Sequence, residues 1–144
     1  MIEIQSITAQ DTYGIRHKVL RPGRPFKECF FEGDTAPQTF HIGAFSMGKL
    51  IGVASFMVDE YSGFSGKQFR LRGMAVLTDY QGQGIGKKLV VYGEEKVREK
   101  GFDLLWFNAR KIAIEFYKRL GFTIKGNAFE IPTVGKHYVM FKKL

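Results

Sequence analysis

The sequence predicts a single domain of the α/β or α+β class, built around one mixed sheet. Strand-like segments dominate the first half of the chain, and strands alternate with helices in the second half. Hydrophobic residues make up 44% of the 144 residues and charged residues 25%, which is typical of a globular protein with a full core. No linker, repeat or low-complexity tract divides the chain, so we expect one domain over residues 1–144.

The first half of the chain predicts four strands and one helix. Apolar and polar residues alternate over residues 1–7, as they do in a half-buried strand. The helix ends where the prolines and glycine of residues 21–25 cannot continue it, and a loop or short helical turn follows over 26–37. The segment Ser46-Met47-Gly48 has the composition of a tight hairpin turn. In order, we expect strands at 1–7, 39–45, 49–59 and 67–77, with the helix at 10–20 after the first of them.

The second half predicts two helices and three strands. Gly101 stands directly after the first helix and Gly121 directly after the second, where glycine commonly ends a helix. The apolar residues of the second helix fall on one face at helical spacing; they are Ile112, Ala113, Phe116, Tyr117 and Leu120. In order, we expect a helix at 85–100, a strand at 102–108, a helix at 109–120, and strands at 122–126 and 136–144.

Residues 79–89, DYQGQGIGKKL, place glycines at 82, 84 and 86 between a strand and a helix. The spacing fits neither the Walker loop nor the G-x-G-x-x-G dinucleotide pattern, because lysines stand where those patterns need other residues. A helix that begins after a glycine turn still offers free amides and a positive dipole end to an anion. Lys87 and Lys88 lie at the positive end of the helix dipole, where a cation is unfavourable. A bound di-anion would make their charge favourable, so we expect a ligand that carries a pyrophosphate. The alternative is a solvated helix start whose glycines serve only the turn.

Composition argues against several other functions. The net charge is +8, yet the basic residues are scattered with no run of five, so nucleic acid is not expected as a partner. The apolar runs are too short to cross a bilayer, and residues 1–11 lack the basic start of a signal peptide. A lone Cys29 cannot form an internal disulfide, so we expect a cytoplasmic protein without membrane contact. Three scattered histidines and one cysteine give no metal-ligand spacing, so no metal is expected.

Two segments resemble motifs of the GNAT superfamily of acetyl-CoA-dependent N-acetyltransferases. Residues 74–90, MAVLTDYQGQGIGKKLV, are similar to the acetyl-CoA motif of that superfamily, with Gln81, Gly84 and Gly86 at the signature positions. Residues 109–122, ARKIAIEFYKRLGF, resemble its second helix motif, which ends in a tyrosine followed by a Leu-Gly-Phe corner. The two motifs stand in the right order with one strand between them.

The resemblance implies a GNAT-like fold, a mixed and mostly antiparallel sheet of six or seven strands with helices on both faces. The sheet would splay between the strand that ends at Val76 and the strand at 102–108, and the splay would form the cofactor cleft. The tail 134–144, VGKHYVMFKKL, is similar to a small single-domain bacterial branch of the superfamily, whose last strand carries a histidine and a methionine.

The same resemblance implies acetyl-CoA as the acyl-donor co-substrate and assigns residues to it. The backbone of Met74, Ala75 and Val76 would pair with the pantetheine arm like an added strand. Gln81 would stand at the entrance, and backbone amides would hold the pyrophosphate; these are the amides of Gly82, Gln83, Gly84, Ile85, Gly86 and Lys87. The superfamily often has an asparagine seven residues before the tyrosine, where this chain has Arg110, and Asn108 is the alternative for that contact.

Tyr117 matches the tyrosine that protonates the leaving thiolate in this superfamily, although helical periodicity alone would make it a core residue. Many relatives also carry a glutamate on a central strand as the general base, and the central strands expected here contain none. His137 and His41 are the candidate replacements, because imidazole titrates near neutrality. A structural role is the alternative for both histidines. Cys29 is expected to be a small, partly buried thiol and not a nucleophile.

The acceptor is the part of the reaction that the sequence constrains least. The resemblance implies direct attack by a primary amine, on a small molecule or a peptide. Four basic residues near the expected acceptor wall either suit an acceptor with an acidic group or are solvated surface; they are Arg16, His17, Arg21 and Arg24. The oligomeric state stays open, a homodimer included. A non-catalytic acetyl-CoA-binding sensor is the alternative function, because no carboxylate base is evident.

Overall fold

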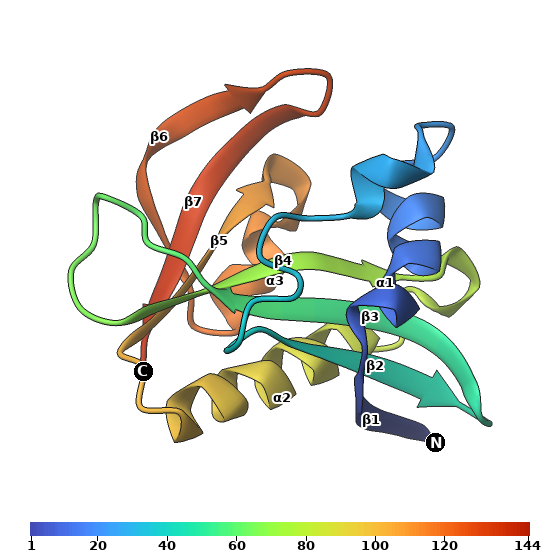
Figure 1. The fold of residues 1–144 in the computed structure, drawn as a ribbon. Coiled ribbons are helices and arrows are strands. Elements are labelled where there is room, and N and C mark those ends of the chain that lie inside the picture. Colours follow the sequence, from blue (N-terminus) through green and yellow to red (C-terminus); the bar gives the residue numbers. More distant parts are fainter.

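The seven strands form one sheet in the order β1-β2-β3-β4-β5-β7-β6, in a computed structural model that describes residues 1–144 (Figure 1). Every neighbouring pair is antiparallel except β4 and β5, which run parallel. The mixed, mostly antiparallel sheet of six or seven strands that the resemblance implies is therefore confirmed, and it has seven strands. The strands are β1 (Ile2–Ile7), β2 (Phe40–Ser46), β3 (Lys49–Val58), β4 (Gln68–Val76), β5 (Leu104–Arg110), β6 (Thr123–Ile131) and β7 (Gly135–Lys143).

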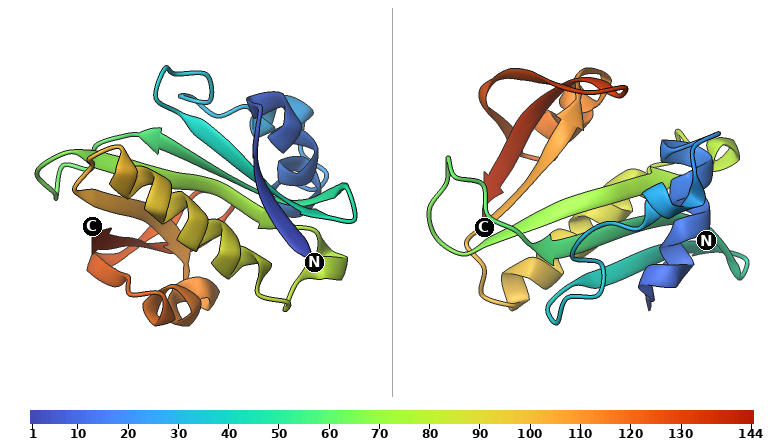
Figure 2. Two further views of the ribbon diagram at one scale, coloured as in Figure 1. Left: turned by 90° about the horizontal axis from the view of Figure 1, so that it is seen from below. Right: turned by 45° about the horizontal axis from the view of Figure 1, so that its top comes forward.

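Helices cover both faces of this sheet (Figure 2). The helical elements are α1 (Ala9–Ile15), η1 (Arg16–Leu20), η2 (Phe26–Cys29), η3 (Thr78–Tyr80), α2 (Ile85–Glu99), η4 (Lys111–Ala113) and α3 (Ile114–Arg119). On one face, Ile15 of α1 packs against Val53 and Ala75. On the other face, α2 and α3 enclose the main hydrophobic core. No helix is long and apolar enough to span a membrane.

The sheet opens between its two central strands. β4 and β5 pair only over Gln68–Arg70 and Leu104–Trp106, and beyond that point they diverge, so that β5, β7 and β6 turn away from the other four strands (Figure 2). The β3–β4 ladder shifts register between Val53 and Ser55, next to Gly73, whose φ of 67° lies in the left-handed region. Such a bulge bends a strand and increases its twist, which explains why β4 leaves β5 here.

One predicted helix begins later than the sequence indicates. The helix expected at 109–120 is preceded by two further strand residues and the 3-10 turn η4, and α3 starts only at Ile114. The cause is the ladder between β5 and β7, which continues to the pair Arg110–His137 and holds those residues extended. Ile112, expected on the apolar face, is therefore 89% exposed. The last strand pair is likewise longer than predicted, because β6 extends to Ile131.

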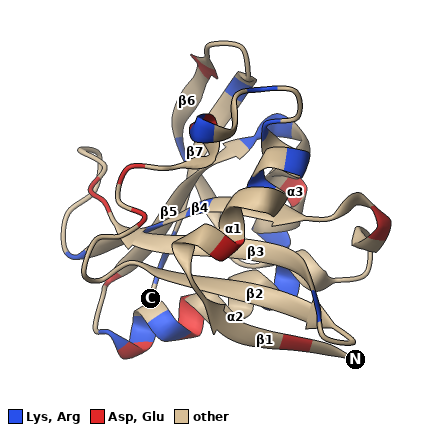
Figure 3. Cartoon of the chain, turned by 45° about the vertical axis from the view of Figure 1, so that its right-hand side comes forward, with Lys and Arg blue, Asp and Glu red and all other residues tan.

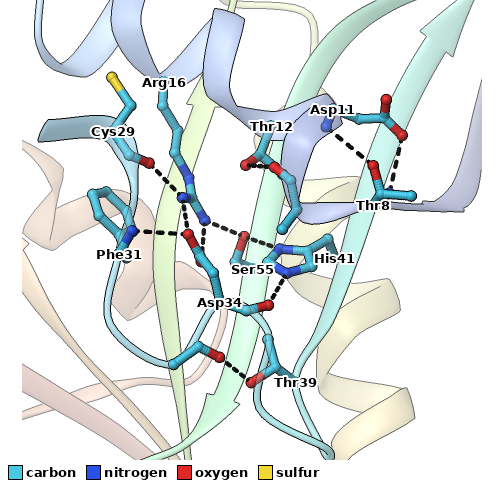
Figure 4. A network of polar contacts seen from close by, with 12 residues as sticks. Thr8, Asp11, Thr12, Arg16, Cys29, Phe31, Asp34, Thr39, His41 and Ser55 are labelled. Carbon is cyan, nitrogen blue, oxygen red and sulfur yellow. Dashed lines mark hydrogen bonds and ion pairs between the residues drawn. The ribbon is translucent and has the colours of Figure 1, made fainter. Parts of the chain in front are cut away.

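A buried ion pair joins the N-terminal helices to the sheet (Figure 4). The Arg16 guanidinium, 0% exposed, donates to both carboxylate oxygens of Asp34 at 2.7 and 2.9 Å. It also donates to the Cys29 carbonyl and to the Ser55 hydroxyl, each at 2.8 Å. Burial would raise the pKa of the Asp34 carboxyl, but hydrogen bonds from Arg16 and from the Phe31 amide outweigh it and hold that pKa below its usual value.

This network overturns the acceptor-wall interpretation of Arg16, because the side chain is enclosed and its charge is already paired. It also explains His41, the weaker candidate for the general base. His41 Nδ1 lies 2.6 Å from the Ser55 hydroxyl and Nε2 lies 2.8 Å from the Asp34 carbonyl, so both ring nitrogens are engaged in structural contacts (Figure 4).

The variant Asp34→Asn tests the structural weight of the pair. It leaves the Arg16 charge buried without its partner, so the free energy of unfolding at pH 7 should fall by about 3–5 kcal/mol. Urea denaturation measures the change. Glu28→Gln is the matched control, because it removes the charge from the exposed Arg24–Glu28 pair and should cost about 0–1 kcal/mol.

The same pair predicts a pH dependence with a defined sign. Since the pKa of Asp34 is lower in the folded chain, its stabilisation is complete above the unfolded value of about 4 and is lost as the pH falls through the folded value. The stability difference between parent and Asp34→Asn should therefore shrink below about pH 4. A difference that stays constant down to pH 2 would contradict the assignment.

Candidate functional site

A cavity of about 920 Å³ fills the opening between β4 and β5. Its walls come from β4, the glycine turn, the start of α2, the end of β5, α3 and β7. The structure thus brings together almost all the site residues expected from the sequence; those that line the cavity are Met74, Ala75, Val76, Gln81, Gly82, Gly84, Ile85, Gly86, Lys87, Asn108, Arg110, Tyr117 and His137. Gln83 is the exception, and it lies on the exposed turn outside the lining.

The cavity has two sides, which correspond to the two faces of the sheet. On β5, Phe107 and Ala109 belong to the main core beneath α2 and α3, together with Tyr117. The intervening residues Asn108 and Arg110 point to the opposite face, because side chains alternate along a strand. His137 pairs with Arg110 across the ladder and shares that face. Tyr117 and His137 therefore approach one opening from opposite sides.

The start of α2 has the features of an anion-binding site. Gly82 and Gly84 have φ angles of 79° and 78°, which allow a turn that side chains would strain. Gly84 provides no side-chain cap and the first turn contains no acid. The first intrahelical bond runs from the Lys88 amide to the Gly84 carbonyl, so the amides of 85–87 have no intrahelical partner. A pyrophosphate fits this arrangement in charge and in hydrogen-bonding capacity.

Gln81 and Gly86 shape the approach to these amides. The Gln81 side-chain amide donates to the Val76 carbonyl at 2.9 Å and ties the turn to the end of β4. A Cβ atom on Gly86 would lie 3.5 Å from Phe116 and 3.7 Å from Met74, so the glycine leaves the wall of the cavity bare between them. Backbone at this point is open to a ligand.

Tyr117 is held by aromatic packing and has an unengaged hydroxyl. Its ring centroid lies 4.2 Å from that of Phe107 and 5.0 Å from that of Phe116, and the residue is 9% exposed. Burial raises the pKa of the phenol above its usual value, so the hydroxyl stays protonated at neutral pH. The Tyr117 hydroxyl has no protein hydrogen-bond partner. It is not fully buried, since Tyr117 lines the cavity.

His137 presents one free ring nitrogen. Nδ1 lies 2.8 Å from the Gly135 carbonyl, which only accepts hydrogen bonds, so in the neutral ring Nδ1 carries the proton. Nε2 then has a free lone pair, and the residue lines the cavity while 5% exposed. This is the tautomer that a proton acceptor requires.

The remaining candidates separate clearly. Arg21 lines the cavity, whereas His17 and Arg24 do not. Cys29 is fully buried outside the cavity, and burial raises the pKa of its thiol, which argues against a nucleophile. No cluster of three His, Cys, Asp or Glu residues could hold a metal ion.

Sequence reasoning missed Arg70 and Arg72, which both line the cavity. They occupy alternating positions of β4, where a polar residue ordinarily faces solvent, so only the glycine at 73 and the neighbouring motif hinted at a site. None of the lining residues is Asp or Glu, which agrees with the missing carboxylate base. In Figure 3 the Lys and Arg residues are spread over the whole fold, so this local excess is not part of a single basic stripe.

Comparisons with known proteins agree with this geometry. Residues 3–122 match the model of the Acetyltransferase (GNAT) family. The chain is 39% identical to an uncharacterized N-acetyltransferase of Bacillus subtilis (strain 168), YitI, over all of this chain and 97% of the relative. The fold is similar to that of Escherichia coli ElaA, with a TM-score of 0.80 at 16% identity over 99% of both chains. An aminoglycoside 6'-N-acetyltransferase complexed with coenzyme A gives a TM-score of 0.77 at 16% identity, over 98% of this chain and 96% of that one.

The anion site predicts a thermal shift that one substitution should abolish. Acetyl-CoA at a hundredfold excess over its Kd should stabilise the folded parent by about 3 kcal/mol, a rise of several degrees in Tm. Gly86→Asp should remove the shift, because it places a carboxylate beside the free amides. Gly86 suits the test better than Gly84, whose positive φ would strain any side chain.

Gly14→Asp is the matched control, since a Cβ atom there meets nothing within 4 Å and the residue lies outside the cavity. It should leave the shift intact. A shift of parental size in folded Gly86→Asp would refute the assignment of phosphate to the start of α2.

Proposed function

Because this chain belongs to the Acetyltransferase (GNAT) family, we propose that it transfers the acetyl group of acetyl-CoA to a primary amine of a small molecule or peptide, by direct attack of the amine on the thioester. The observation that carries the proposal is the convergence of three groups on one opening. Free amides at the start of α2 and the Tyr117 hydroxyl lie on one side, and Nε2 of His137 lies on the other.

The donor side offers two kinds of backbone contact. The β4 edge that faces β5 has no strand partner beyond Arg70, so the backbone of Met74–Val76 is available to an extended pantetheine arm. The amides of 85–87 and the turn at Gly82–Gly84 would hold the pyrophosphate, with Lys87 adding charge. Asn108 and Arg110 lie at the end of β5 on the face of His137, and a cofactor contact by either of them stays a prediction.

Two protons must move in the reaction, and the chain has one group for each. Acetyl-CoA supplies the thioester, whose carbon–sulfur bond breaks as the carbon–nitrogen bond forms. The Tyr117 hydroxyl would donate its proton to the leaving sulfur, and its raised pKa keeps it protonated until then. His137 Nε2 would accept the proton that the amine loses, while the Gly135 carbonyl keeps the ring oriented.

A screen for acetyl-CoA consumption tests the proposal directly. Purified protein is mixed with acetyl-CoA and a panel of amines, amino acids and peptides, and the released thiol is measured. Thiol release that depends on an amine, with an N-acetylated product found by mass spectrometry, is expected. Tight acetyl-CoA binding without release from any amine would contradict the transfer reaction and would favour a non-catalytic sensor.

Tyr117→Phe isolates the proton donor. Phenylalanine keeps the ring contacts with Phe107 and Phe116, so the fold and acetyl-CoA affinity should change little. Loss of a general acid should lower kcat by about 10²–10⁴-fold with the best amine of the screen. Tyr92→Phe, the same change outside the cavity, should keep the parental rate. Equal turnover by Tyr117→Phe and the parent would remove Tyr117 from the mechanism.

His137→Gln isolates the proton acceptor through the pH profile. Ionisation of the acceptor amine affects every variant alike, so the informative quantity is the slope of log kcat/KM against pH. A protonated His137 could not accept the proton, so toward acid pH log kcat/KM of the parent should fall more steeply than that of His137→Gln. His17→Gln, on a histidine outside the cavity, should keep the parental slope. Identical slopes in parent and His137→Gln would make His137 structural.

A further inference from the structure

The acceptor side of the cavity is lined by arginines, and no Asp or Glu belongs to the lining. Side chains alternate along β4, where Phe69 and Leu71 belong to the core beneath α2. Arg70 and Arg72 therefore point to the opposite face, the face of His137. Since the cavity lining contains no Asp or Glu, these cations find no carboxylate within the lining itself.

Among the half-buried arginines of the cavity lining, Arg72 is the one without a polar partner; Arg110 and Arg119 are also unpaired, but they are exposed. Arg16 is bound to Asp34 on both carboxylate oxygens, and Arg70 donates to Asp59 at 3.0 Å. Arg72 makes no hydrogen bond or ion pair, and its Cζ atom lies over the Phe31 ring, 4.4 Å from the ring centroid. The nitrogens of Arg72 are not fully buried, and the residue lines the cavity, so we place the guanidinium at the cavity surface.

The surroundings of Arg72 favour an anion beside it. The side chain is half-buried, and burial together with the charges of Arg70 and Arg16 lowers the pKa of its guanidinium, although the Asp34 and Asp59 carboxylates act in the opposite direction. Stacking on Phe31 limits the positions of the guanidinium and orders it before any ligand arrives. A planar, ordered guanidinium without a partner is suited to bidentate binding of an oxyanion.

The phosphates of acetyl-CoA are not the natural partner of this group. The free amides that would hold the pyrophosphate lie at the start of α2, on the other face of the sheet. Arg72 lies instead with Phe31, which follows η2, and with Val19 and Leu20 of η1, which all line the acceptor side.

We propose that Arg72 binds a carboxylate or phosphate group of the acceptor, so that the substrates of this chain are amines that also carry an oxyanion. This inference rests on the proposed acetyl transfer and adds the substrate class to it. Polycationic amines are disfavoured for the same reason, because the cavity lining offers them no carboxylate.

The test compares acceptors that differ in charge. The probes are β-alanine and O-phosphoethanolamine as anionic acceptors, ethanolamine as the neutral reference and spermidine as the polycation. For each, kcat/KM is measured with the parent, with Arg72→Gln and with Arg24→Gln. The anionic-to-neutral ratio is kcat/KM for an anionic acceptor divided by kcat/KM for ethanolamine. Differences in amine pKa cancel when this ratio for a variant is divided by the ratio for the parent. The separate carboxylate and phosphate probes show which oxyanion is preferred.

The parent should prefer one or both anionic acceptors, and Arg72→Gln should lower the anionic-to-neutral ratio by about 10–100-fold, as expected for loss of a charged hydrogen bond. Arg72→Lys should lower it less, since the charge remains but the bidentate fork is lost. Arg24→Gln should change the ratio by less than about twofold, because Arg24 is exposed, paired with Glu28 and outside the cavity. Retained acetyl-CoA binding confirms that each variant is folded.

The outcomes separate this inference from the function on which it rests. Acetylation with an unchanged ratio in Arg72→Gln, or a parent that prefers spermidine, would overturn the acceptor assignment and leave acetyl transfer intact. Absence of turnover with every amine, here and in the wider screen, would overturn the transfer reaction, and the acceptor assignment would fall with it.

Discussion

The divergence of β4 and β5 is the constraint on which the site depends. Backbone groups that leave a ladder must find other partners, and past Arg70 the edge of β4 that faces β5 has none within the sheet. Phe31 and Arg16 pack closely against β4 at Gly73, just beyond the point where β4 leaves β5. A Cβ atom on Gly73 would lie 2.8 Å from the Phe31 ring and 3.0 Å from Arg16 Nε. Because Asp34 fixes Arg16 at that position, only glycine fits at residue 73, where the β3–β4 ladder is irregular.

The positive charge of the cavity offers a reason why no carboxylate base is present. An amine must lose its proton before it can attack, and like charges nearby disfavour the ammonium form. Arginines on the acceptor side would lower the pKa of a bound amine, and an oxyanion on the same acceptor would offset their repulsion at binding. In the proposed reaction a single imidazole would then suffice as the proton acceptor, whereas a glutamate would stabilise the ammonium and compete for the arginines.

The sequence predicted those parts of the molecule that depend on local patterns. The glycine turn, the hairpin at Met47 and the helix α2 before Gly101 all lie where turn and helix-ending residues predicted them. The parts that failed depend on contacts distant in sequence. No local pattern around Arg16 predicts that it is buried and paired with Asp34, eighteen residues away. The strand residues before α3 are held extended by pairing with β7. Alternation along β4 predicts which face Arg72 occupies, but it does not predict that this face borders a cavity.

The polar groups in and around the sheet divide by whether the protein satisfies them. Both ring nitrogens of His41 are engaged, and the two terminal nitrogens of Arg16 make four hydrogen bonds, while Arg16 Nε is buried without a partner. These contacts hold the structure together. The Tyr117 hydroxyl, His137 Nε2 and the Arg72 guanidinium have no protein partner. Tyr117 and His137 are buried residues and Arg72 is half-buried, so each has lost part of its contact with water. Removing a polar group from water without a partner has a free-energy cost. Since these three face a single cavity, that cost has a common explanation if ligand atoms complete their hydrogen bonds during the reaction.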